Sequence, residues 1–141
     1  MNLDDVYNIL TKNGYKLTKQ RKVLIDIFIK NRDLFLSVED IQRKINKIGI
    51  NLDLSTIYRN LMVLENSNLV CKIQNENSNL YKIRTMKKHH HHLICKKCGK
   101  AVSFEYCPTD TFSRIAEENG YTFTDDKIEL YGYCNNCKNN L

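Results

Sequence analysis

The sequence lacks any apolar run long enough to cross a bilayer, and residues Met1–Asp5 have neither the basic nor the apolar region of a signal peptide. It also contains no His-Glu-x-x-His motif, which places a general base beside an open zinc ion in many hydrolases. These absences argue against a membrane protein and against a zinc hydrolase. We therefore expect a cytoplasmic protein that is not an enzyme.

The length of 141 residues fits one domain, or two small domains that share stabilising devices because each half alone would bury only a thin core. Lysine and arginine together number 22, and the formal net charge is +6. This modest excess suits a polyanionic partner but is also compatible with solubility alone. Charge by itself therefore does not identify the partner.

Four of the six cysteines form two Cys-x-x-Cys pairs, Cys95 with Cys98 and Cys134 with Cys137. In a reducing cytosol such pairs bind metal more often than they form disulfides. Two pairs supply the four thiolates of a closed tetrahedral zinc site. The pattern predicts a structural zinc ion, and it leaves open a zinc-ribbon interaction module in which zinc only stabilises the fold.

Four helices and a hairpin are predicted in the first half. Apolar residues at helical spacing begin near residues 3, 19, 38 and 55, and Thr18 and Ser37 are placed to cap the second and third helices. Two strand-like runs, residues 69–73 and 80–83, flank a polar turn. This order of elements predicts a winged helix-turn-helix.

The fourth predicted helix has two distinct faces. Ile57, Leu61 and Leu64 share one face by helical spacing. The other face carries Ser55, Thr56, Tyr58, Arg59 and Met62. Hydroxyls, a phenol and a guanidinium near a helix N-terminus suit the major groove of DNA. An ordinary solvated face explains this helix equally well when it is considered alone.

The second half begins after a short basic segment at residues 85–88, which we interpret as a hinge. Its pattern predicts strand, strand, helix, strand, strand. Beyond the histidine segment, strands are expected at residues 101–104, 121–123 and 128–131, and Pro108 suits the first turn of a helix that Gly120 closes. The two cysteine pairs would then lie at neighbouring strand ends and share one zinc ion.

Four consecutive histidines, residues 89–92, precede the first cysteine pair. In a strand, successive side chains alternate, so His90 and His92 point to one face and His89 and His91 to the other. Each pair can chelate its own metal, and zinc, ferrous iron and nickel all suit imidazole with carboxylate or thiolate. The alternatives without a site are an expression tag and a solvated histidine cluster.

Three further side chains are candidate ligands. Cys107 and Asp110 flank the start of the second-half helix, and Asp126 precedes the last strand. Cys107 is equally well explained as a buried structural thiol, and Asp110 as a charge that favours a helix N-terminus.

Three ordered motifs, residues 55–61, 89–100 and 129–137, together resemble the ferric uptake regulator family of bacterial repressors. The resemblance covers nearly the whole chain, from Asn13 to Cys137. It implies an α+β fold with a winged-helix DNA-binding domain at residues 1–84, a hinge at 85–88 and an α/β dimerisation domain at 89–141. It also implies a homodimer that binds palindromic double-stranded operator DNA when a regulatory metal site is filled.

The resemblance assigns roles to individual residues. It gives the structural zinc ion to Cys95, Cys98, Cys134 and Cys137. It gives operator contacts to Tyr58 and Arg59, with Ser55 and Thr56 on the same helix, and it makes Lys16 and Arg21 contacts to the DNA backbone or minor groove.

Departures from the family pattern favour its zinc uptake regulator branch. Iron and peroxide sensors usually place a histidine ahead of the third helix, where this chain has Phe35, and the segment around Cys107 resembles the zinc regulators. Against this branch, the chain lacks its usual cysteine near Arg84 and has Asp126 where a histidine is common. An iron- or peroxide-sensing member of the family is therefore the alternative.

We expect metal to close a hinge and fix two winged-helix domains at a spacing that matches successive major-groove faces. Metal must favour that form by roughly 5 kcal/mol to make it dominant rather than rare. The regulatory zinc or ferrous iron is assigned to His90, His92 and Cys107, with Glu76 as a candidate fourth ligand. An auxiliary site is assigned to His89, His91, Asp110 and Asp126.

Overall fold

The computed structural model describes residues 2–74, 78–84 and 90–139, and the chain divides into two compact units, Met1–Lys87 and Lys88–Leu141. The expected hinge at residues 85–88 lies outside the described residues, as do the candidate ligands Glu76 and His89. None of the described helices combines the length and the apolar character needed to span a bilayer.

The first unit begins with four helices, each preceded by a side chain that accepts a backbone N–H of the first turn. The helices are α1 (Leu3–Lys12), α2 (Lys19–Lys30), α3 (Val38–Lys47) and α4 (Leu54–Asn66). Thr18 and Ser37 cap α2 and α3 as predicted, while Asn2 and Asp53 cap α1 and α4. These caps satisfy donors that a helix leaves without an internal partner, so local sequence fixes where the helices begin.

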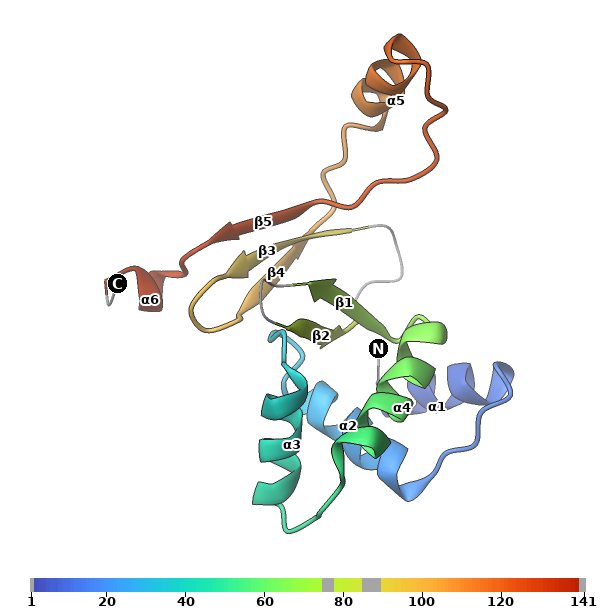
Figure 1. Ribbon diagram of the computed structural model, residues 1–141, viewed down its shortest axis with the longest axis vertical. Helices are drawn as coiled ribbons and strands as arrows, with labels where there is room; N and C mark the ends of the chain where they lie inside the picture. Colours follow the sequence, from blue (N-terminus) through green and yellow to red (C-terminus); the bar gives the residue numbers. More distant parts are fainter. Residues whose placement is uncertain (1, 75–77, 85–89, 140–141) are drawn as a thin grey trace. The chain divides into compact units, whose positions relative to one another are not determined.

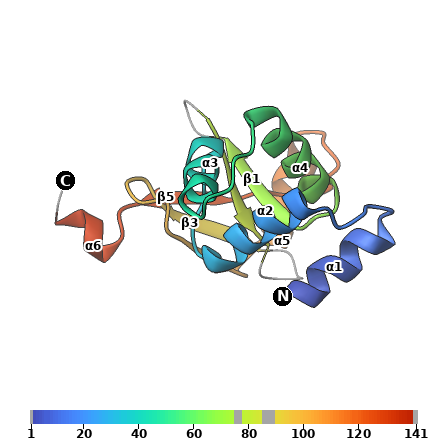
Figure 2. The same cartoon turned by 90° about the horizontal axis from the view of Figure 1, so that it is seen from below.

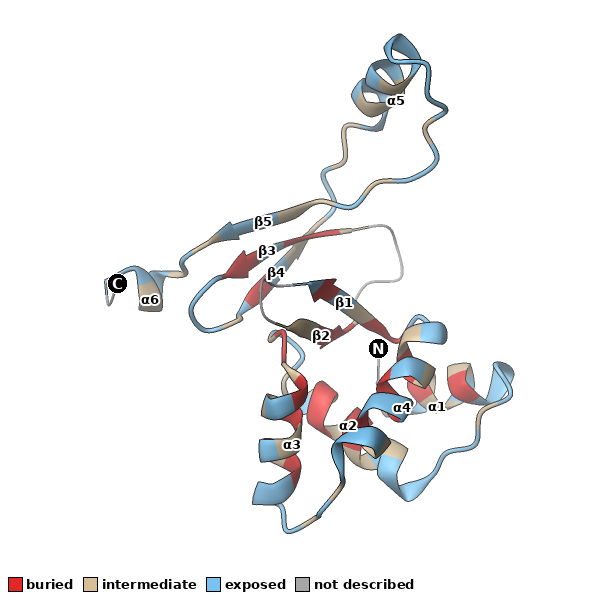
Figure 3. Cartoon of the chain, in the orientation of Figure 1, coloured by how far each residue is buried: buried red, intermediate tan, exposed pale blue. Residues whose placement is uncertain are grey.

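A two-stranded antiparallel sheet completes the first unit, with β1 (Val70–Gln74) beside β2 (Asn79–Ile83). Helices α2, α3 and α4 contact one another (Figure 1 and Figure 2). Their inward faces are buried and join the two strands in one contiguous core that contains Phe28, Ile41 and Leu61 (Figure 3). The unit is the predicted winged helix-turn-helix.

The second unit contains a three-stranded sheet with strand order β4-β3-β5. Its elements are β3 (His91–Cys95), β4 (Ala101–Phe104), α5 (Thr109–Glu118), β5 (Glu129–Gly132) and α6 (Asn135–Lys138). Strand β3 is antiparallel to β4 and parallel to β5. The α+β fold class is therefore confirmed.

The strand predicted at residues 121–123 is wrong, because residues 121–128 form no regular secondary structure. Instead, the Phe123 ring packs against Phe112 of α5, with centroids 6.2 Å apart. Phe123 therefore packs on a helix and does not pair in a sheet, while Tyr121 is exposed.

The second unit buries few apolar side chains. Among the described residues of this unit, only Ile94, Cys95 and Ala101 are buried apolar residues, and α5 buries none. One face of the sheet instead exposes Leu93, Val102 and Leu130, which are 45%, 56% and 48% exposed. These three residues are register partners across the strands, so they form one apolar sheet face.

Candidate metal centres and DNA-reading surface

The four cysteines of the two Cys-x-x-Cys pairs meet at one end of the sheet. Cys95 ends β3 and Cys134 follows β5, and because these strands are parallel, both pairs lie at the same edge. The four sulfurs lie within 4.8 Å of one another, and those of Cys98 and Cys134 are 3.8 Å apart. Tetrahedral zinc with Zn–S bonds of about 2.3 Å requires sulfur–sulfur distances of about 3.8 Å. The cluster therefore fits a zinc ion.

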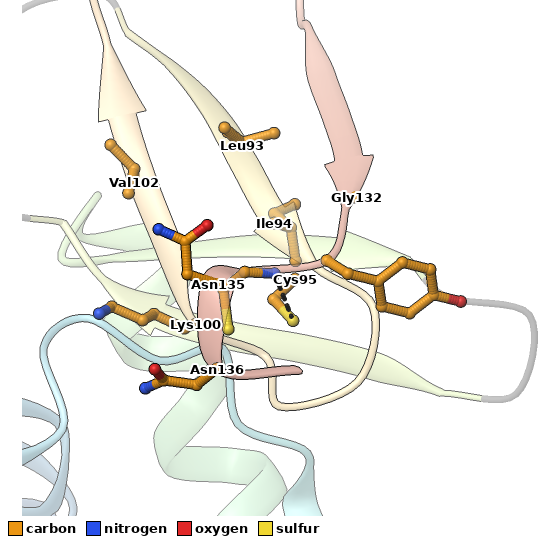
Figure 4. A pocket seen from close by; sticks show the side chains of 10 residues that line it. Leu93, Ile94, Cys95, Lys100, Val102, Gly132, Asn135 and Asn136 are labelled. Atoms are coloured by element: carbon orange, nitrogen blue, oxygen red, sulfur yellow. Dashed lines mark hydrogen bonds between the residues drawn. The ribbon is translucent and has the colours of Figure 1, made fainter. Parts of the chain in front are cut away.

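Charge at this cluster also favours a cation. Backbone N–H groups, first that of Cys134 at 3.4 Å from the sulfur (Figure 4), lower the pKa of Cys95 to about 6. Hydrogen bonding with the Cys134 sulfur, then burial and the other nearby sulfurs, raises the pKa of Cys137 to about 12. Crowded sulfurs thus resist carrying four negative charges together, and a zinc ion removes that repulsion.

His91, Cys107 and Asp126 form a second cluster in the same unit. Nε2 of His91 lies 3.0 Å from an Asp126 carboxylate oxygen, and the Cys107 sulfur lies 3.4 Å from both oxygens. A tetrahedral zinc ion would separate its nitrogen and oxygen ligands by about 3.4 Å, and its sulfur and oxygen ligands by about 3.6 Å. The two spacings to Asp126 are therefore within a few tenths of an ångström of those around a zinc ion, and all three ligand atoms lie within 4.8 Å of one another.

The hydrogen bonds of His91 determine which ring nitrogen holds its proton. The backbone N–H of Ile128 donates to Nδ1 over 3.1 Å, so the neutral ring carries its proton on Nε2, facing Asp126. A metal held at Nε2 would displace this proton, and the ring would stay neutral only if a proton were taken up at Nδ1 instead. The bond from Ile128, directly before β5, would then be lost.

His90 and His92 lie on the other side from His91, as alternation predicts. Their rings touch edge to face with centroids 4.8 Å apart. Glu129 is the register partner of His92 on β5. Although burial opposes it, hydrogen bonds from Tyr131 and Lys127 lower the pKa of Glu129, and charge on His92 adds to the effect. Glu129 is therefore an ionised candidate ligand that sequence reasoning missed.

The structure groups Cys107 differently from our sequence assignment. It lies with His91 and Asp126, and not with His90 and His92. The reason is the strand register: His91 pairs with Phe104, and the chain reaches Cys107 shortly after that residue. Asp110 is exposed in the first turn of α5 and belongs to no group of three possible ligands among the described residues.

Helix α4 presents the face expected for DNA reading. Ile57, Leu61 and Leu64 are buried, whereas Ser55, Tyr58 and Arg59 are exposed and Thr56 is half-buried. Leu54 and Met62 are also exposed, one turn on either side of Tyr58. The exposed face therefore combines apolar groups with hydrogen-bonding groups, as major-groove contacts require.

The two other predicted DNA contacts, Lys16 and Arg21, differ in how far their charged groups are free to reach DNA. Lys16 is exposed on the segment between α1 and α2. Arg21, on α2, has its guanidinium engaged inside the unit. Its Nε donates to the Asn60 side-chain oxygen over 3.2 Å, its Nη1 donates to the Lys16 carbonyl, and the group lies 5.7 Å above the Tyr15 ring centroid.

A family sequence model and an individual relative both match this chain over most of its length. The sequence model of the Ferric uptake regulator family matches residues 12–131. The ferric uptake regulation protein of Neisseria gonorrhoeae is 32% identical over 130 residues, which cover 92% of this chain and 90% of that relative.

Two solved structures carry different metals. A ferric uptake regulator from Francisella tularensis, solved with iron, has a TM-score of 0.71 and 28% identity, and covers 89% of this chain and 96% of its own. A zinc-bound manganese uptake regulator has a TM-score of 0.67 and 27% identity, and covers 92% of this chain and 98% of its own. Similarity alone therefore does not select the metal.

Proposed function

Because this chain belongs to the ferric uptake regulator family, we propose that it is a homodimeric repressor that binds palindromic operator DNA when a regulatory site holds zinc. Members of the family are metal-responsive, DNA-binding transcriptional regulators and not enzymes. Beyond this family function, we propose the identity of the effector metal, the residues that bind it and the homodimeric state.

The observation that carries the choice of zinc is the presence of the Cys107 thiol beside His91 and Asp126. A thiolate with imidazole and carboxylate is a softer donor set than imidazole and carboxylate alone, and it favours zinc over manganese or ferrous iron. We assign the regulatory zinc ion to these three residues. Cys95, Cys98, Cys134 and Cys137 hold the structural zinc ion.

His90 and His92, with Glu129 beside His92, form a further candidate site of nitrogen and oxygen donors, which suits zinc or ferrous iron. If His91 held the metal at Nε2, its ring proton would have to move to Nδ1, and the Ile128 N–H would then lose its acceptor. Metal binding at His91 would thus change the hydrogen bonding of Ile128, the residue directly before β5. Operator binding rises because the metal-bound dimer favours one spacing of its winged-helix domains.

The test uses a duplex recovered from a random-sequence pool by the zinc-loaded protein. Anisotropy then measures its affinity in chelator, zinc, ferrous iron and manganese. Zinc should activate binding most strongly in the wild type, Cys107→Ser should lose that activation, and Cys107→Asp should shift the preference toward ferrous iron or manganese. Asp110→Asn is the matched control, because exposed Asp110 lies outside the cluster, and it should respond as the wild type does.

A ferrous-iron sensor is the second candidate, favoured by the iron in the Francisella tularensis regulator and by the His90 and His92 pair. Activation by ferrous iron but not by zinc would replace our proposal with this one. Equal affinity in chelator and in every metal would instead indicate a zinc-ribbon module without regulation.

A further inference from the structure

The side chain of Arg21 connects the segment between α1 and α2 to helix α4. Its guanidinium bonds the Lys16 carbonyl with one nitrogen and the Asn60 oxygen with another, and it lies over the Tyr15 ring. One planar group therefore contacts two residues of the α1–α2 segment and one residue of α4. A lysine ammonium has no such fork and cannot reproduce both bonds from one position.

Asn60 is a fixed anchor for this connection. It is only 7% exposed, and its amide nitrogen donates to the Thr56 carbonyl over 2.9 Å, which leaves its oxygen directed at Arg21. Asn60 directly follows Arg59 on α4, and its neighbours Ile57 and Leu61 are buried in the core. The anchor thus moves only if α4 itself moves.

We propose that Arg21 is a positioning residue that holds Lys16 at a set place beside the reading face of α4, and that Arg21 does not itself contact DNA. This inference rests on the proposed function, because it takes Lys16 and Arg59 as operator contacts. Lys16 is exposed while its backbone carbonyl is held, so its ammonium extends from a fixed base.

The consequence is that the Lys16 contact is preorganised before DNA binds. Without the Arg21 bonds, the Tyr15 and Lys16 segment has more conformations to lose on binding DNA, which weakens affinity without removing any charge. If the Lys16 side chain and its backbone had to be ordered on binding, the entropy cost would weaken binding roughly tenfold.

The test measures affinity for the duplex recovered from the random pool, with zinc-loaded full-length protein. Arg21→Lys keeps the positive charge and should weaken binding roughly tenfold, with the salt dependence of affinity unchanged. In a Lys16→Ala background the same change should have little further effect, because the residue to be positioned is gone. Arg32→Lys is the matched control and should bind as the wild type does, because Arg32 is exposed and donates to the Ile29 carbonyl three residues before it.

A second pair of variants tests the connection from the side of α4. Asn60→Leu removes the acceptor for Arg21 at similar volume and should match Arg21→Lys, and the double variant Arg21→Lys with Asn60→Leu should bind little more weakly than either single variant. Additive losses from Arg21→Lys and Lys16→Ala would overturn the inference, as would a lower salt slope for Arg21→Lys. If the wild-type protein recovers no preferred duplex from the pool, both the inference and the proposed function fail. If it recovers one and the losses are additive, the inference alone fails.

Discussion

At the scale of single residues, Arg59 is the side chain on α4 best suited to reading a base. It is exposed, and the hydrogen bond from its Nε to the Ser55 carbonyl is long, at 3.4 Å, so its guanidinium remains available for a guanine edge. Arg59→Lys keeps the charge but loses bidentate geometry. We expect a loss of about 1–3 kcal/mol of discrimination at one base pair, with an unchanged salt slope.

The measurement compares affinities for duplexes that differ at each base pair in turn, over a range of salt concentrations. Lys22→Arg on α2 is a control that alters a basic side chain outside the reading face. A uniform loss of affinity at every sequence would show that Arg59 contacts phosphate only.

The residues of the metal sites illustrate what sequence can and cannot predict at this scale. Spacing alone predicts that Cys95 and Cys98 act together, because both lie on one turn, and strand alternation separates His91 from His92. It does not predict that Cys107 joins His91, since this depends on the register of β3 against β4. The proximity of Glu129 to His92 likewise follows from a parallel pairing between distant segments.

At the scale of elements, the helices were the most predictable part of the fold. Thr18 and Ser37 mark the starts of helices because each accepts a hydrogen bond from a backbone N–H three residues later. Such a cap can be predicted from neighbouring residues alone. Residues 121–123 show the limit of this reasoning. Their alternation satisfies the pattern of a strand, but a strand also needs a partner, and here the partner of Phe123 is the Phe112 ring.

The apolar sheet face of β3, β4 and β5 supports an element-scale prediction about dimerisation. Leu93, Val102 and Leu130 form a contiguous exposed apolar surface, which is typical of an interface. Val102→Glu places a charge at its edge, and we expect the protein to become monomeric. Affinity for a palindromic duplex should then fall at least a hundredfold, because two linked half-site contacts become independent.

Light scattering gives the oligomeric state and anisotropy gives the affinity. Val102→Thr keeps a β-branched side chain of similar size and is expected to remain dimeric. A Val102→Glu protein that stays dimeric would show that this sheet face lies outside the interface.

At the scale of the whole molecule, the two units depend on different sources of stability. The first unit has a contiguous apolar core, whereas the second buries only Ile94, Cys95 and Ala101 as apolar residues in the part that is described. Structural zinc sites supply about 10–16 kcal/mol, comparable to or above the total stability of a small domain, which is about 5–15 kcal/mol. Chelation should therefore unfold the second unit and leave the first one folded.

Hydrogen exchange in the presence of a strong chelator tests this division. Amide protection should be lost in β3, β4 and β5 while it persists in α2, α3 and α4, and added zinc should restore it. Cys98→Ser should lose the same protection even in zinc, because three thiolates no longer close the tetrahedron. Loss of protection in both units together would mean that metal supports the first unit as well, and retained protection in the sheet would mean that the four cysteines do not hold the metal on which the fold depends.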